Sequence, residues 1–259
     1  MWTGVVIVLA SVVVTAIAFL LFGRSRAHEQ ADDRDADSRG FLGAVISGLF
    51  IVALAFYVVI VWEEGGAAED NAAKEAAAVA DVYWQTAVMP QPQRDQIRTL
   101  LTDYPKLVAD KEWPKLAVGE SDDATTATLN SLHADVLSLP SSPDQVKSAR
   151  ERSLERLREV TDLRRDRLDS ASGLDNTGRI MLIGTIAGAV AMIVFPLLIG
   201  FTARKRHILQ MCLTAAVLAF VCVLCTGMTQ PFDGWFRVEP ESFTSLSEEL
   251  AGIPIDENR

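Results

Sequence analysis

Four long apolar runs, separated by strongly polar stretches, dominate the pattern of hydrophobic and polar positions along the chain. They cover residues 4–22, 41–62, 180–202 and 208–228, and none of them contains Asp, Glu, Lys or Arg. Each run is about as long as the ~20 residues that a helix needs to cross ~30 Å of hydrocarbon. Backbone amides cannot stay unpaired in lipid, so such runs must be helical. The pattern predicts an all-α integral membrane protein with four transmembrane helices.

The first run has a second interpretation, as a cleaved secretory signal peptide. It lacks positive charges before the apolar stretch and a small-residue cleavage motif after it, and Arg24 and Arg26 follow it instead. These features favour a retained anchor with the N-terminus outside. If the run were cleaved, three spans would remain.

The polar region between the second and third runs, residues 63–179, has the periodicity of a helical soluble domain. Pro90 and Pro92 are expected to end the first of its helices, Pro105 to start, kink or break the second, and Ser142 with Pro143 to start the last. The predicted helices cover residues 69–89, continuing from the second span, 94–115, a segment around 129–137, and 143–170. They predict a bundle of about four helices.

These elements predict four regions. Residues 1–62 hold the first two spans and a short charged loop at 23–40, residues 63–179 the soluble domain, 180–228 the last two spans, and 229–259 a C-terminal tail. The tail has a possible short helix at 245–251. Its aromatic residues are expected to anchor at the membrane interface or to pack on the soluble bundle: Phe232, Trp235, Phe236 and Phe243.

The distribution of charge bears on orientation and partners. Loop 23–40 and the turn at 204–207 together carry seven Lys and Arg, which the positive-inside rule places in the cytoplasm, with the soluble domain outside a bacterial plasma membrane. The basic cluster Arg164, Arg165, Arg167 and Arg179 before the third span argues for the opposite orientation. The net charge is -10, and residues 63–179 hold 22 acidic against 15 basic residues, so nucleic acid is not an expected partner.

Catalytic and metal-binding motifs are missing from the sequence. It has no phosphate-binding P-loop, no G-x-S-x-G elbow and no H-E-x-x-H, so we expect neither an enzyme nor a cofactor or metal. The three histidines, His28, His133 and His207, are far apart along the chain. The three cysteines lie in the fourth run, where we interpret them as packing residues: Cys212, Cys222 and Cys225.

Ion conduction remains possible because a passive pore needs no charge inside the membrane. The spans lack the ionisable groups that coupled transport normally requires. Ser47 and Thr185 are candidate pore-lining residues, and Glu63 and Glu64, at the end of the second span, could form an acidic ring at a pore mouth. Alternatively, the hydroxyls bond to their own helices and the two glutamates mark the water boundary.

Small residues and one proline suggest how the spans pack. Gly184 and Gly188 form a G-x-x-x-G motif in the third span, and Gly43 and Gly48 lie in the first turns of the second. They can serve packing within one subunit or an interface between subunits. Pro196 is expected to kink the third span, either as a gating hinge or as a static bend.

Short motifs in a fixed order give the chain a family resemblance over residues 41 to about 245. Those motifs comprise Glu75, Ala76, Val82, Tyr83, Tyr104, Glu112, Trp113, Pro114, Arg164, Arg165, Arg167, Leu168, Pro231, Phe232 and Gly234. In these residues the chain resembles the bacterial bestrophin-like domain proteins. The resemblance implies a four-span architecture and, by analogy with bestrophins, a homo-oligomeric ion channel. It also implies that Glu75, Trp113 and Arg165 form a polar and aromatic network that holds the soluble helices in register.

Two hypotheses of function follow. The first is an oligomeric, channel-like membrane protein that passes small ions, surrounded by membrane lipid. The alternative is a non-conducting scaffold or sensor whose extracytoplasmic helical domain binds a protein partner.

Overall fold

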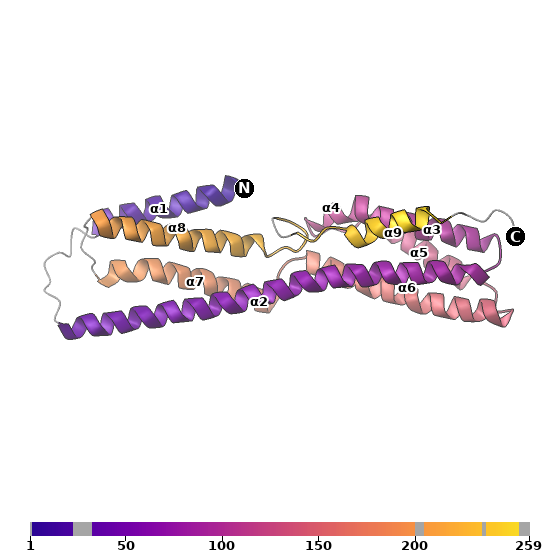
Figure 1. Ribbon diagram of the computed structural model, residues 1–259, viewed down its shortest axis with the longest axis horizontal. Helices are drawn as coiled ribbons and strands as arrows, with labels where there is room; N and C mark the ends of the chain where they lie inside the picture. The colour runs from indigo at the N-terminus through magenta and orange to yellow at the C-terminus, as the bar shows by residue number, and fades with distance from the viewer. Residues whose placement is uncertain (1, 23–32, 200–204, 235–236, 254–259) are drawn as a thin grey trace. The chain divides into compact units, whose positions relative to one another are not determined.

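The computed structural model describes residues 2–22, 33–199, 205–234 and 237–253. Helices account for most of these residues, and no β-strand occurs among them (Figure 1). The α-helices are α1 Trp2–Phe22, α2 Asp33–Gln85, α3 Gln93–Leu107, α4 Trp113–Leu116, α5 Asp123–Leu137, α6 Asp144–Ala171, α7 Asn176–Ile199, α8 Lys205–Gly227 and α9 Glu241–Ala251. The all-helical fold class is therefore as expected.

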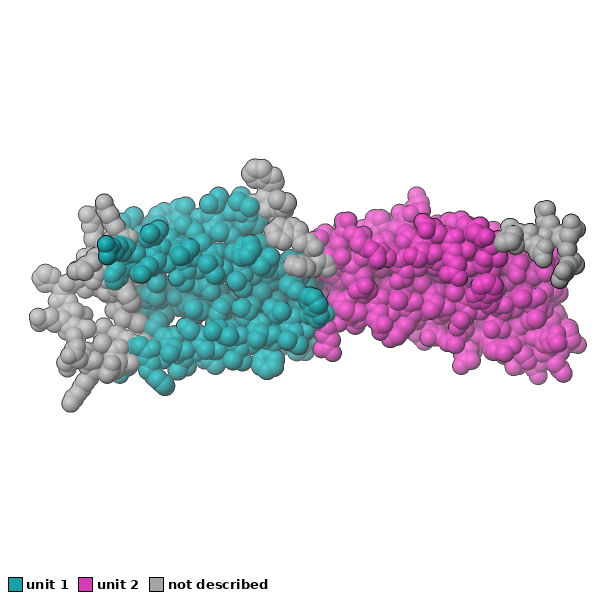
Figure 2. Space-filling view, in the orientation of Figure 1, with its two compact units in different colours: residues 1–62, 174–229 teal, residues 63–173, 230–259 magenta. Residues whose placement is uncertain are grey.

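The chain forms two compact units, coloured separately in Figure 2. Unit 1 consists of residues 1–62 and 174–229, and unit 2 of residues 63–173 and 230–259. The C-terminal segment thus belongs with the helical domain rather than standing apart as a tail. The chain passes between the units three times, and α2 makes the first of these passages without interruption.

Among the described residues, three helical stretches are long and apolar enough to cross a membrane: Gly40–Val88, Asp144–Pro196 and Arg206–Gly227. Their apolar parts lie in α2, α7 and α8 and correspond to the second, third and fourth apolar runs. The apolar stretch described in α1, Gly4–Ala18, is shorter, so a first span remains a prediction.

The helices of unit 1 pack through apolar contacts. The α1 helix lies along α8, and α7 contacts both. Tyr57 donates a hydrogen bond from its hydroxyl to the carbonyl of Cys225 at 2.6 Å, which links α2 to α8. Two buried clusters join these helices: Phe50, Ala189 and Leu218 in one, and Tyr57, Val61 and Cys225 in the other.

Unit 2 is built around one apolar core that the second half of α2 shares with α3, α5, α6 and α9. The α3 helix contacts both α5 and α9, and α6 contacts α5. Small buried side chains on α2, such as Ala68, Ala72 and Ala76, let the neighbouring helices approach closely. After Gln85 a short 3₁₀ turn ends the helix, because Pro90 and Pro92 cannot extend it.

The helix predicted at 94–115 is interrupted in the structure. The α3 helix continues past Pro105, and a π-helical stretch, Val108–Glu112, joins it to α4. The amide of Trp113 bonds to the first carbonyl of that stretch, five residues back. In a straight α-helix the ring of Pro114 would collide with the carbonyl four residues earlier, and the wider turn relieves this collision. The irregularity therefore precedes Pro114 rather than following from Pro105.

Capping signals locate the remaining helices only in part. Asp122 caps α5, since its Oδ2 accepts a hydrogen bond from the Thr125 amide at 3.0 Å. At the start of α6 the cap position is Pro143, with no side-chain hydrogen bond, so the prediction that Ser142 is the N-cap was wrong. The α9 helix begins directly after Pro240, earlier than predicted.

Candidate functional site

Unit 2 contains a buried cluster of four charged side chains, which we call the charge cluster: Glu75, Glu112, Arg164 and Arg167. Glu75 comes from α2, Glu112 from the π-helical stretch, and the two arginines from α6. Arg164 and Arg167 are three residues apart, so they lie on one face of α6. Two carboxylates and two guanidinium groups give the cluster no net charge, which makes its burial tolerable.

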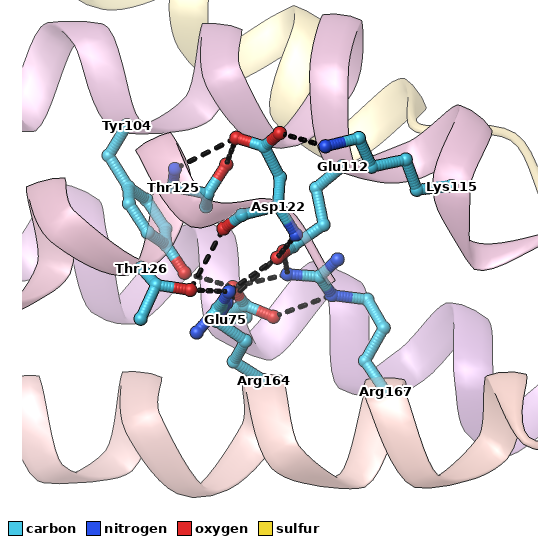
Figure 3. A network of polar contacts seen from close by, with 9 residues as sticks. All are labelled: Glu75, Tyr104, Glu112, Lys115, Asp122, Thr125, Thr126, Arg164 and Arg167. Carbon is cyan, nitrogen blue, oxygen red and sulfur yellow. Dashed lines mark hydrogen bonds and ion pairs between the residues drawn. The ribbon is translucent and has the colours of Figure 1, made fainter. Parts of the chain in front are cut away.

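Arg167 makes the central contacts of the charge cluster (Figure 3). Its Nε and Nη2 donate to the two carboxylate oxygens of Glu75, both at 3.0 Å, in a bidentate pair. Nη2 also donates to Glu112 Oε2 at 3.0 Å. One guanidinium thus ties α2 and the π-helical stretch to α6.

Arg164 completes the cluster on the other side of Glu112. Its Nε donates to Glu112 Oε2 at 3.2 Å, and its Nη2 forms a close ion pair with Oε1. The same Nη2 donates to the hydroxyl of Thr126 at 2.8 Å, which brings α5 into the network. Burial alone raises the pKa of Glu112, but the hydrogen bond from Arg164 and the charges of both arginines outweigh it, so this pKa is lower than usual.

Tyr104 connects α3 to the charge cluster. Its hydroxyl donates to Glu75 Oε1 at 2.6 Å, in a fully buried position. Burial, and next the negative charge of Glu75, raise the pKa of this phenol well above its usual value. The Tyr104 phenol therefore stays protonated near neutral pH and can donate its hydrogen bond.

Asp122 forms an outer arm of the same network (Figure 3). Its amide donates to Glu112 Oε1 at 3.2 Å, and its Oδ1 accepts a bond from Lys115 Nζ at 2.5 Å. The hydrogen bond from Lys115, followed by that from the Thr125 amide, lowers the pKa of Asp122 to about 2. The N-terminus of α5 is thereby fixed to the helix that carries Glu112.

Two aromatic rings lie over the guanidinium of Arg167. Its guanidinium carbon lies 5.5 Å from the ring centre of Trp113 and 5.3 Å from that of Phe243. Among the described residues no atom accepts a hydrogen bond from the buried Nη1 of Arg167, and its guanidinium is instead close to these two rings. Trp113 also packs edge-on against Phe232 and donates from Nε1 to the carbonyl of Val238 at 3.0 Å.

The network expected from the family motifs therefore exists around Glu75 and Trp113, but Arg165 does not belong to it. The Arg165 side chain is 71% exposed and pairs with Asp162 on its own helix. Successive residues of an α-helix point about 100° apart. The buried face of α6 therefore contains Arg164 and Arg167 instead of Arg165. The sequence could have predicted this. The apolar residues Leu157 and Val160 are three positions apart, and continuing their spacing of three and four residues leads to positions 164 and 167.

The other motif residues hold the C-terminal segment in place. Pro114 lies in the first turn of α4. The carbonyl of Pro231 accepts a bond from the Val238 amide at 2.7 Å, and Phe232 is buried in the core. Gly234 has a φ of +87°, a left-handed conformation that favours glycine.

None of the candidate pore residues belongs to the charge cluster. Ser47 donates to the carbonyl of Gly43, and Thr185 to the carbonyl of Met181, each at 2.9 Å and within its own helix. Glu63 is exposed and Glu64 partly exposed on α2. Their role in a pore remains a prediction.

The glycines of the spans fall into two groups. A Cβ at Gly188 would lie 3.1 Å from a ring carbon of Phe50, and one at Gly43 would lie 3.0 Å from a ring carbon of Phe195. A Cβ at Gly48 or at Gly184 would meet no atom within 4 Å. The first pair thus packs against neighbouring helices of the same chain, whereas the second pair is open. The α7 helix continues through Pro196 to its end at Ile199.

The described residues contain no group of three or more His, Cys, Asp or Glu side chains arranged to hold a metal ion. Glu75, Glu112 and Arg167 are fully buried, Arg164 is nearly so, and the carboxylates are already bonded to arginines, so the charge cluster offers no open position for a substrate. Its arrangement suits one task, which is to hold four helices and the π-helical stretch in a fixed register.

Comparison with known proteins agrees with the motifs. Residues 8–243 match the family described as Bestrophin-like domain. No curated protein and no solved structure matches the chain. Since the match covers most of the sequence, the chain belongs to the Bestrophin-like domain family.

Proposed function

We propose that this membrane protein is a homo-oligomeric, channel-like protein that passes small ions, with α2 at the face where copies assemble. The observation that carries the proposal is an exposed line of small residues on α2. Gly40, Ala44 and Gly48 are all exposed, and a Cβ at either glycine would meet no atom within 4 Å. Small residues at such spacing let helices of different subunits approach closely in a membrane.

The interior of unit 1 supports assembly as the source of a pore. Its buried clusters are apolar, and the hydroxyls of Ser47, Thr185 and Thr214 bond to carbonyls one turn back in their own helices. Bonds of this kind leave these three hydroxyls little capacity to line a polar path through a single chain. A conducting path requires several copies around an axis.

Glu63 and Glu64 follow the last apolar residues of the second run, as expected of a pore mouth. In a symmetric oligomer each would be repeated around the axis and would attract cations. Unit 2 is acidic as well. The proposal therefore favours cations over anions at this mouth.

The test is ion flux of the purified full-length protein in liposomes, with native mass spectrometry on the same sample to count subunits. Gly48→Leu should reduce both the oligomer fraction and the flux by about 10-fold, because added bulk at a close interface costs 1.4 kcal/mol or more. Ala10→Leu, at an exposed position of α1, is the matched control and should change neither. If the two variants have the same oligomer fraction and the same flux, α2 is not the face where copies assemble.

The proposed orientation, with unit 2 outside the bacterial plasma membrane, needs its own test. Ser131 is exposed on α5, so a cysteine there is open to reagents. In a background with the three native cysteines replaced by Ala, Ser131→Cys should react with an impermeant maleimide in intact cells. Protection until lysis would place unit 2 in the cytoplasm.

A non-conducting scaffold or sensor is the second candidate, and a surface pocket on unit 2 favours it. The pocket has a volume of about 300 Å³ and lies between α3 and the end of α9, with Tyr83, Arg98, Asp103 and Leu250 in its lining. A stable oligomer that carries no ions at any voltage or pH would support this candidate over the channel.

A further inference from the structure

The chain enters or leaves unit 2 at three points, and each leads within a short distance to the charge cluster or its aromatic cover. The boundaries lie at residues 62/63, 173/174 and 229/230. They follow the second apolar run, precede the third and follow the fourth. The three segments that continue from them into unit 2 are α2, the end of α6, and residues 230–251.

Two of these segments meet through one bidentate ion pair. Glu75 lies on α2, and Arg167 lies in the last turns of α6, close to its end at Ala171. Both side chains are fully buried, and two hydrogen bonds of 3.0 Å join them. A shift of either helix along its axis would break this pair and leave a charge buried without its partner.

The third segment meets the same guanidinium through its aromatic cover. Phe232 packs on Trp113 with ring centres 5.2 Å apart, and the carbonyl of Val238 accepts the indole N–H of Trp113. Further along, the ring of Phe243 lies over Arg167. The segment after α8 therefore contacts Arg167 through aromatic rings, whereas α2 contacts it through an ion pair.

We propose that Arg167 and Trp113 form a shared anchor that couples the three segments, so that releasing residues 230–251 also loosens α2 and α6 around the charge cluster. This inference holds whether or not the protein conducts ions. The physical reason is that the buried positive charge of Arg167 is balanced by Glu75 and Glu112, and a buried charge that loses such partners is unstable. Removing the ring of Phe243 opens space beside this guanidinium, water then reaches the ion pairs, and the pairs hold their helices less tightly.

The test is hydrogen exchange of the full-length protein in lipid nanodiscs, followed in peptides covering 71–79 of α2, 160–171 of α6 and 241–251 of α9. Phe243→Leu removes the ring over Arg167 but keeps an apolar side chain of similar size. We expect exchange to rise about 5-fold in all three peptides.

Leu246→Ala is the matched control. Leu246 is, like Phe243, a buried residue of α9, but it has no aromatic ring to place over Arg167. It should raise exchange in 241–251 alone. The coupling is refuted if the effect of Phe243→Leu is confined to 241–251, or if Leu246→Ala loosens α2 and α6 to the same degree.

A milder variant decides the case if Phe243→Leu does not fold. Trp113→Phe keeps a smaller aromatic ring near Arg167 and Phe232 and deletes the N–H that donates to Val238. A rise of about 3-fold in 71–79 and 160–171 together with 230–251 is expected. Unchanged exchange in α2 and α6 would overturn the proposal.

Discussion

The two units of this protein are both helical, but they satisfy their polar groups in opposite ways. In unit 1 the hydroxyls of Ser47 and Thr185 bond to carbonyls of their own helices, and contact between helices is mostly apolar. In unit 2 the strongest bonds run between helices, from Arg167 on α6 to Glu75 on α2 and to Glu112. The positions of the spans therefore depend on shape, whereas those of the soluble helices depend on the geometry of ion pairs.

The largest expected effect comes from removing the centre of the charge cluster. Arg167→Met leaves Glu75 and Glu112 with too little positive charge, and breaking a buried pair in this way costs about 3–5 kcal/mol of stability. The measurement is urea unfolding of the full chain in detergent, followed by the circular dichroism of its helices.

Arg165→Met is the control on the same helix. Because Arg165 is largely exposed and pairs with the equally exposed Asp162 on its own helix, its loss should change stability by no more than about 0.5 kcal/mol. If the two variants are equally stable, the ion pairs do not set the positions of the helices in unit 2.

An intermediate effect is expected where unit 1 depends on shape. Gly188→Leu forces a side chain into Phe50, and overpacking of this kind costs about 1–3 kcal/mol. Gly184→Leu, one turn away, meets open space and should leave the fold of the single chain intact. Thermal unfolding in detergent compares the two. A Gly184 variant as unstable as the Gly188 variant would contradict the described packing of α7.

The smallest of the three effects concerns Asp122, at the edge of the charge cluster. Asp122→Ala removes the cap of α5 and should cost about 0.5–2 kcal/mol at neutral pH. The pKa of Asp122 is about 2, below the ~3.9 of an unfolded Asp, so its contribution is complete above pH ~4. The stability difference from wild type should therefore shrink as the pH falls from about 4 to about 2.

Asp123→Ala serves as the control for this pH series. Asp123 is the exposed neighbour of Asp122 and lies one position beyond the cap. Its removal should cost less and should show no comparable change across the same pH range. A constant difference between Asp122→Ala and wild type down to pH 2 would mean that the hydrogen bond to Lys115 has little energetic value.

Much of the fold could be predicted because lipid imposes a strict pattern. The charge-free runs locate α7, α8 and the first half of α2, and the prolines after Met89 mark where α2 ends. The pairing inside unit 2 could not be predicted in the same way. Glu75 and Arg167 are far apart along the chain, and only the packed helices bring them together.

The wrong prediction for Arg165 shows that buried and exposed positions of α6 can carry the same residue type. Arg164, Arg165 and Arg167 have the same side chain, so residue type cannot tell which of them is buried. Only the face of α6 on which each one lies decides this. The G-x-x-x-G motif shows the same limit. Gly184 and Gly188 look equivalent in the sequence, yet the space beside Gly184 is open, whereas Gly188 packs against Phe50. Helix phase relative to a neighbour is a property of the assembled bundle rather than of any local segment.

The π-helical stretch Val108–Glu112 bears on how the chain length can vary. A π-helical turn contains one residue more than an α-helical turn. If this extra residue is removed, the side chains of the following helix keep their directions relative to the helix before it. Deleting one exposed residue there, such as Asp110, together with Pro114→Ala, which removes the ring that would collide with the carbonyl four residues earlier, should convert it to a regular α-helix while Trp113 still faces the core. A deletion elsewhere in α3 would instead rotate every later side chain by about 100°. Among relatives of this protein, gains and losses of single residues between Tyr104 and Trp113 should gather at this turn.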